Sequence, residues 1–159
     1  MPRRRSLALF FNLLLSFPCY ALAGNDPAPP GLIPITLPGG TIIHAELADT
    51  PQKRAEGLMY REHLGADRGM LFTFSQAQAW VFWMKNTKIP LDILYFDDAL
   101  KLVSQQRDVP PCSLGDRCPP YPSDAPARYV LELNAGEAAR IGLKDGAELK
   151  FGPGIKAGN

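Results

Sequence analysis

Apolar and polar positions alternate along two stretches of the chain, which is the pattern of a β-strand that buries one face. Residues 41–48 place Ile43, Ala45 and Leu47 on one side of such a strand, and residues 100–109 alternate in the same way. Shorter apolar runs bounded by turn residues predict further strands at 69–74, 80–85, 91–96, 129–133 and 148–151. The pattern therefore predicts a fold built from short strands.

Two short helices are expected between these strands. Thr50 suits the N-cap of the first, Pro51 its first helical position, and Gly57 its end. The second is expected at residues 135–141, before Gly142. With so little helix, the sequence predicts an all-β class, a mainly antiparallel sandwich or distorted barrel with two short helices.

The turn residues 86–90 separate two of the predicted strands. This segment, Asn86-Thr87-Lys88-Ile89-Pro90, is predicted to be a turn, so that residues 91–96 return along residues 80–85 as a hairpin. A long proline-rich loop is expected at residues 110–126.

The N-terminus has the three parts of a secretory signal peptide. Arg3, Arg4 and Arg5 precede an apolar run at residues 7–17, and Ala21-Leu22-Ala23 forms a small-x-small cleavage site. The apolar run is shorter than the roughly 20 residues that a membrane-spanning helix needs. We therefore expect cleavage after Ala23 and a periplasmic or secreted protein. Ordinary secretory and twin-arginine export both remain open.

The segments after the signal peptide predict one domain. Residues 24–34 are rich in proline and glycine and are expected to form a linker. Residues 35–153 then form a single β-rich domain, and residues 154–159 a flexible tail. This length is sufficient to bury one core.

Removal of the signal peptide changes the charge. The whole chain has a formal charge of +1, and residues 1–23 hold three Arg and no acidic residue, so the remainder carries +1 − 3 = −2. A chain without a basic excess is not expected to bind nucleic acid. No stable membrane anchor is expected after cleavage either.

Cys112 and Cys118 are the two cysteines left after cleavage. In an oxidising compartment such a pair usually forms a disulfide, which is the expectation here. A redox role is the sharper alternative, but the spacing is not that of a Cys-x-x-Cys motif. A zinc site would need more ligands than two Cys and two distant His.

Five segments occur in an order that resembles a known family. They are Gly57–Glu62, Gly69–Phe72, Phe82–Thr87, Ile89–Asp92 and Ala127–Gly136. The chain resembles the domain of unknown function 192 family from about Ile35 to Phe151. The resemblance implies a compact β-fold of sandwich or distorted-barrel type, often exported, and it implies no activity and no cofactor. Cys112 and Cys118 followed by Tyr121 also resemble a pattern in exported members.

The block around residues 83–92 holds the main site candidates. Lys85, Asn86 and Asp92, with Thr87 between them, could form a polar cluster in a cleft. Alternatively, Asn86 and Asp92 could stabilise the hairpin turn through side chain–backbone hydrogen bonds. A charge within an apolar run, such as Asp92, needs a partner if it is buried.

Arg61 could bind an anionic or sugar ligand through its planar guanidinium, or could pair with Asp92 or Glu132. Trp83 and Tyr121 could form part of a stacking platform for a sugar ring, or could be core residues.

Thioethers offer a different chemistry. Met59, Met70 and Met84 lie in three apolar segments and could together bind copper(I). The alternative is that each fills an irregular part of the core.

The favoured hypothesis is a non-enzymatic ligand-binding or accessory module of the cell envelope, for a saccharide or another envelope component. Its candidate ligand-binding residues are Arg61, Trp83, Lys85, Asn86, Thr87, Asp92 and Tyr121. The alternative is a hydrolase that uses Asp92 with Lys85 or Arg61, and a periplasmic copper-binding protein is a third option. The sequence contains no Gly-x-Ser-x-Gly elbow that would favour an esterase.

Overall fold

The computed structural model describes residues 30–152 and residue 155, so the expected signal peptide and most of the expected linker lie outside the described residues. The strands are β1 (Ile33–Thr36), β2 (Ile42–Ala48), β3 (Arg68–Gln78), β4 (Val81–Trp83), β5 (Leu91–Phe96), β6 (Leu102–Val109), β7 (Pro120–Pro122), β8 (Ala127–Asn134) and β9 (Lys150–Phe151). The α-helices are α1 (Pro51–Glu56) and α2 (Glu137–Arg140).

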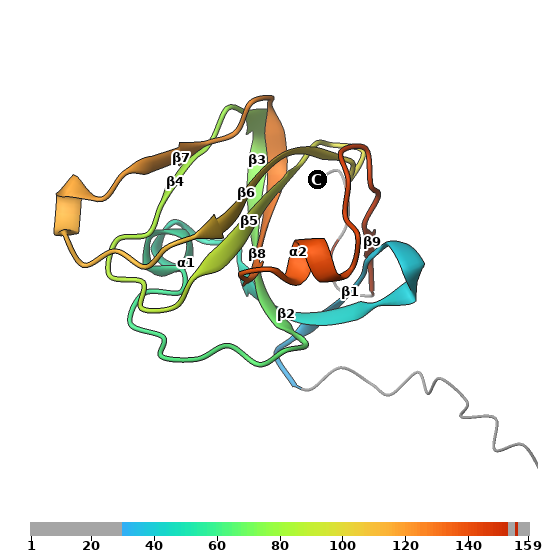
Figure 1. Ribbon diagram of the computed structural model, residues 1–159. Helices are drawn as coiled ribbons and strands as arrows, with labels where there is room; N and C mark the ends of the chain where they lie inside the picture. Colours follow the sequence, from blue (N-terminus) through green and yellow to red (C-terminus); the bar gives the residue numbers. More distant parts are fainter. Residues whose placement is uncertain (1–29, 153–154, 156–159) are drawn as a thin grey trace, which may run out of the picture.

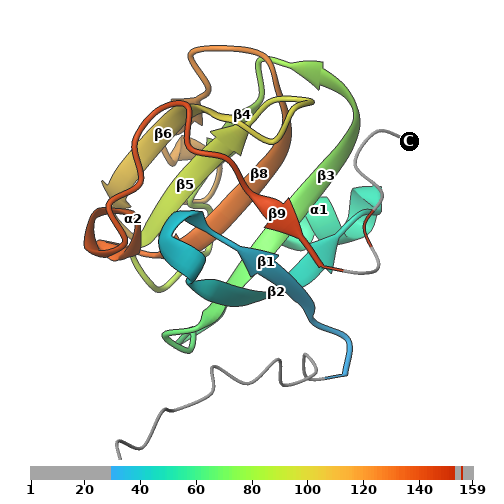
Figure 2. The same ribbon diagram turned by 90° about the vertical axis from the view of Figure 1, so that its right-hand side faces the viewer.

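The main sheet has the strand order β6-β5-β8-β3-β2-β1-β9 and curls into a half-barrel (Figures 1 and 2). Its neighbours are antiparallel except β2 and β3, which are parallel and are joined by the crossover that contains α1. β4 and β7 form a separate two-stranded sheet beside it. The all-β class with two short helices is therefore confirmed.

The predicted hairpin between residues 80–85 and 91–96 is wrong. β4 pairs with β7, in the register Val81 with Pro122 and Trp83 with Pro120. The two edges of β5 are already occupied by β6 and β8, so β5 has no free edge for β4. Residues 86–90 therefore carry the chain from the small sheet to the main sheet.

The predicted termini of the elements agree with the structure in some places and differ in others. The side chain of Thr50 accepts a hydrogen bond of 3.2 Å from the Lys53 amide at the start of α1, as expected of an N-cap. Gly57 ends this helix with a φ of 51°, a conformation that glycine adopts at little cost. β1 begins inside the expected linker, because Ile33 pairs with Ala45 of β2.

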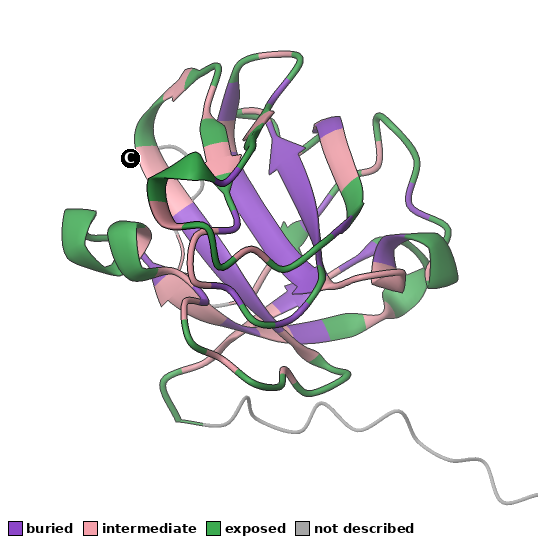
Figure 3. Ribbon diagram, turned by 60° about the vertical axis from the view of Figure 1, so that its left-hand side comes forward, coloured by how far each residue is buried: buried purple, intermediate pink, exposed green. Residues whose placement is uncertain are grey.

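The main sheet separates two groups of buried side chains. On one face, Leu94 and Phe96 of β5 pack with Leu131 and Leu133 of β8. On the other face, Ile93 of β5 packs in the second of these groups, which we call the second core. Side chains of neighbouring strand residues point to opposite faces, so a residue's place in β5 or β8 decides which core it enters. Figure 3 shows these buried strands passing through the middle of the molecule.

A disulfide joins Cys112 to Cys118, as expected, with the two Cα atoms 5.9 Å apart. The backbone of Cys112 also forms isolated β-bridges with Lys85 and Thr87, on the segment that follows β4. The hydroxyl of Tyr95 on β5 donates a hydrogen bond of 2.6 Å to the carbonyl of Tyr121. These contacts attach the small sheet to the main one.

Among residues 30–152 and 155, no helix has the length and hydropathy of a membrane span.

Candidate functional site

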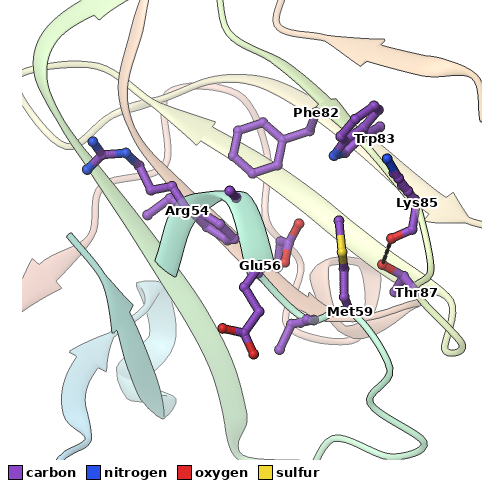
Figure 4. A pocket seen from close by; sticks show the side chains of 12 residues that line it. Arg54, Glu56, Met59, Phe82, Trp83, Lys85 and Thr87 are labelled. Atoms are coloured by element: carbon purple, nitrogen blue, oxygen red, sulfur yellow. Dashed lines mark hydrogen bonds between the residues drawn. The ribbon is translucent and has the colours of Figure 1, made fainter. Parts of the chain in front are cut away.

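A small hollow lies between α1, the small sheet and the second core (Figure 4). Its walls come from α1 and the turn after it, from β3, from β4 and the segment that follows, and from β8. Its volume is about 30 Å³. A cavity of roughly 10–15 Å³ on this scale holds one water molecule, so the hollow has room for one or two groups of that size.

Glu132 is the polar group at the inner wall of the hollow. It follows Val130 on the same side of β8, while Leu131 and Leu133 point into the other core. Its side chain is 4% exposed, and its Oε2 atom is fully buried without a hydrogen-bond partner among residues 30–152 and 155. Burial raises the pKa of Glu132 to about 8. A carboxyl group in this environment is mostly protonated at neutral pH.

Two cationic side chains line the hollow, and each has other partners. The ammonium of Lys85 pairs with the carboxylate of Asp116 and lies 4.9 Å from the centre of the Trp83 ring. The guanidinium of Arg54 donates to the carbonyls of Asp49 and Thr73. In Figure 4 the guanidinium of Arg54 points away from the middle of the hollow. Neither cation therefore neutralises Glu132.

Two aromatic residues of β4 define the outer part of the site. Phe82 points inward and meets Phe72 edge to face, with ring centres 4.9 Å apart. Trp83 points outward and is 45% exposed. Both residues also border a larger hollow of about 300 Å³ on the small sheet, next to Pro120. The site thus combines a small polar interior with a wide aromatic exterior.

Asp92 is not part of this site, and the expected cluster with Lys85 and Asn86 does not form. Its Oδ1 accepts from the Asp108 amide at 2.9 Å, and its Oδ2 accepts from the Ala138 amide at 2.8 Å. The parity of β5 places Asp92 on the face of Leu94, opposite to the face that holds the hollow. Asp92 stabilises the backbone at the end of β6 and in α2, and not the predicted hairpin turn.

The remaining sequence candidates are divided among different surroundings. Arg61 forms a bidentate pair with Glu46, at 2.8 and 2.7 Å, and not with Asp92 or Glu132. Asn86 has a φ of 56° and donates to the Tyr60 hydroxyl at 2.9 Å.

Thr87 and Tyr121 lie nearer the site. Thr87 is buried and lines the hollow together with Trp83 and Lys85. Tyr121 pairs with Phe82 across the small sheet. The structure therefore brings three of the seven candidates, Trp83, Lys85 and Thr87, to the same hollow.

The three methionines have different environments. Met70 and Met84 are buried in the second core, which is the packing role that the sequence left as an alternative. Met59 lines the hollow, and Figure 4 shows its side chain between Glu56 and Thr87. Within the described part of the chain, no group of three His, Cys, Asp or Glu side chains is arranged to hold a metal.

Glu132 is not among the ligand-binding residues predicted from the sequence, which offered it as a partner for Arg61. One signal for it is present: an acid stands at a position of an apolar strand, residues 129–133, where both neighbours are leucine. A charge in such a run needs a partner if it is buried. The sequence could not show that this partner is absent.

The chain is similar to a known protein family and to solved structures. Residues 35–151 match the DUF192 family, described as "Uncharacterized ACR". No curated protein matches the chain. One similar crystal structure is a "putative transcription regulator" from Sinorhizobium meliloti 1021, with 34% identity and a TM-score of 0.67; the match covers 76% of this chain and 92% of that one.

A second similar structure is a protein of unknown function from Novosphingobium aromaticivorans DSM 12444. It has 33% identity and a TM-score of 0.71, and the match covers 80% of this chain and 94% of that one. The family match covers most of the chain, and both structures share its fold. The chain therefore belongs to the DUF192 family.

Proposed function

We propose that this protein is an exported, non-enzymatic binding module of the cell envelope, and that it binds a saccharide at the hollow beside Trp83. The observation that carries the proposal is the exposed Trp83 ring next to a hollow whose inner wall holds a buried carboxyl without a partner, Glu132. Aromatic faces stack on the apolar faces of sugar rings, and a few convergent polar groups fix the orientation of a bound ligand.

The export part of the proposal rests on one sequence feature and one structural feature. The N-terminal segment has the composition of a signal peptide, with a cleavage site after Ala23. The disulfide between Cys112 and Cys118 is of a kind that persists in oxidising compartments. The charge of −2 that remains after cleavage gives no basic surface for nucleic acid, so we do not propose a role in transcription.

The hydrolase hypothesis loses the geometry on which it depended. Lys85 pairs with Asp116, Arg61 pairs with Glu46, and Asp92 is held by two backbone amides. We do not propose it further. The copper hypothesis has no support from Met70 and Met84, which are packed in the core.

Tryptophan fluorescence tests the binding proposal, because the two tryptophans have different environments. Trp83 is exposed, whereas Trp80 stacks on Phe74 and donates to the Ala127 carbonyl. Titration with monosaccharides and envelope oligosaccharides should change the Trp83 emission in a saturable way. In Trp83→Phe the remaining Trp80 emission should not respond.

An Ile42→Ala variant is the matched control, because Ile42 is also an exposed apolar residue, 41% exposed, but lies on β2. It should bind as the wild type does. If no saccharide changes the emission, or if Trp83→Ala binds as tightly as the wild type, the proposed function is wrong.

A further inference from the structure

The hollow contains a buried carboxyl group that lacks any counterpart. Oε2 of Glu132 has no hydrogen-bond partner, and no ion pair of Glu132 is found among the described residues. A buried acid usually has such a partner, because desolvation without one costs free energy. An acid that has no partner and faces a hollow is therefore positioned to bind a group of a ligand.

The size and lining of the hollow indicate which group that is. A volume of about 30 Å³ admits one or two groups of the size of water, which includes a primary ammonium and excludes a trimethylated one. Phe72 and Phe82 present aromatic rings to this space, and Met59 presents a thioether. Aromatic faces attract cations, and this attraction strengthens away from water.

The cations of the protein itself are held elsewhere. Lys85 is held by Asp116 and the Trp83 ring, and Arg54 by two backbone carbonyls. The position opposite Glu132 is therefore open to a cation from a ligand. Trp83, which also lines the hollow, is exposed and can stack on the ring that carries this cation.

We infer that the ligand of this site is an amino sugar with a free ammonium group, which enters the hollow and pairs with Glu132 while its ring stacks on Trp83. This inference rests on the proposed function, since it specifies which saccharide the site recognises. Glu132 is protonated at neutral pH in the free protein, because burial raises its pKa to about 8. When the ammonium binds, Glu132 loses this proton to the buffer, and the ammonium keeps all of its own.

Matched ligands test the inference. D-glucosamine carries the ammonium, D-glucose carries a hydroxyl at the same carbon, and N-acetylglucosamine carries a neutral amide. At pH 6.5 calorimetry should give glucosamine an affinity at least about tenfold higher than either neutral sugar, in line with a charge-assisted hydrogen bond. Titrations in two buffers of different ionisation enthalpy should show release of nearly one proton for each glucosamine bound, and none for glucose.

Two variants complete the test. Glu132→Gln keeps the shape of the neutral acid but cannot ionise, and it should bind glucosamine and glucose with similar affinity and release no proton. Glu148→Gln removes a carboxylate that is exposed and paired with Lys101, outside the lining of the hollow, and should behave as the wild type. Proton release by the wild type needs no variant, so a Glu132 variant that does not fold leaves this measurement valid.

The possible outcomes separate the two proposals. Equal affinity of the wild type for the three sugars, or glucosamine binding without proton release, overturns the amino-sugar inference and leaves the saccharide function standing. If none of the three sugars binds, the amino-sugar inference is overturned, and the saccharide function is overturned as well when the envelope oligosaccharides also fail to change the Trp83 emission. Methylammonium and tetramethylammonium, each added in competition with glucosamine, test the size argument. The first should displace glucosamine and the second should not, and displacement by tetramethylammonium would also overturn the inference.

Discussion

Asp92 and Glu132 are buried carboxyl groups on adjacent strands that point to opposite faces of the main sheet. Ile93, the residue after Asp92, is the direct partner of Glu132 in the pairing of β5 with β8. Two backbone amides donate to Asp92, whereas Oε2 of Glu132 has no donor in the part of the chain that the structure describes. The first acid is satisfied within the fold, and the second requires a proton or a ligand.

The pH dependence of stability should report this difference. Because the pKa of Glu132 is raised from 4.5 to about 8, the folded protein binds its proton more tightly than the unfolded chain does. This contribution to stability is complete below about pH 4.5 and is lost as the pH rises to about 8. The loss approaches about 1.4 kcal/mol for each pH unit within this window.

Chemical denaturation at pH 5, 6.5 and 8 measures this effect in the wild type and in Glu132→Gln. The free energy of unfolding of the variant should lack this part of the pH dependence. Its stability relative to the wild type should therefore increase as the pH rises. Glu148→Gln should keep the wild-type slope. Parallel curves for the wild type and Glu132→Gln would show that Glu132 titrates normally.

Asp92 should matter for folding. Asp92→Ala removes the acceptor of the Asp108 and Ala138 amides, which lie at the end of β6 and in α2. The Ala138 bond is buried and the Asp108 bond is partly buried, and a buried donor without a partner costs roughly 1–3 kcal/mol. Urea denaturation should therefore show a loss of about 2–4 kcal/mol, whereas Asp67→Asn, at an exposed site, should lose less than about 1 kcal/mol.

The disulfide should contribute modestly to stability. Its loop is short, so the chain-entropy relation gives about 2 kcal/mol for the cross-link between Cys112 and Cys118. A reductant should lower the free energy of unfolding of the wild type by about this amount. The same reductant should not affect the variant in which both cysteines are serine, and an equal effect on both proteins would contradict the prediction.

Gly69 allows β3 and β8 to approach each other. A Cβ atom at this position would lie 2.8 Å from the backbone oxygen of Glu132 and 2.9 Å from Leu133 Cδ2. Gly69→Ala should therefore cost about 3 kcal/mol by overpacking. Gly39→Ala has open space around it and only a left-handed backbone, with a φ of 83°, so it should cost about 1 kcal/mol. Thermal denaturation of the two variants compares these costs.

Export can be tested by the N-terminus of the mature protein. Expressed in a bacterium with its own leader, the protein recovered from the periplasmic fraction or the medium should begin at Gly24, as measured by mass spectrometry. An intact N-terminus in the cytoplasmic fraction would contradict this prediction.

The elements that local patterns define were predicted well. The cap of α1 at Thr50 and the alternation of β2 depend on neighbouring residues, so the sequence contains the information. The pairing of β4 depends on contacts far along the chain: its partner β7 lies within a proline-rich segment that has no strand pattern. The predicted hairpin paired β4 with β5, the next strand along the chain, and this prediction was wrong.

Only part of the candidate site was predicted, because the rest depends on contacts between distant segments. Trp83, Lys85 and Thr87 come from one block of sequence and do line one hollow. Asp92 belongs to the same block but points to the other face, because β5 joins the main sheet in a register that the sequence does not reveal. Glu132 comes from a distant strand, and its lack of a partner is a property of the folded structure.

The titration of Glu132 itself tests the central claim most directly. The chemical shift of its side-chain carboxyl carbon, followed by NMR from pH 4 to 10, gives its pKa in the free protein and in the presence of saturating glucosamine. The pKa should be about 8 in the free protein and should fall when the ammonium is bound. An ordinary pKa in the free protein, or the same pKa with and without glucosamine, would contradict the assignment of Glu132 as the binding group.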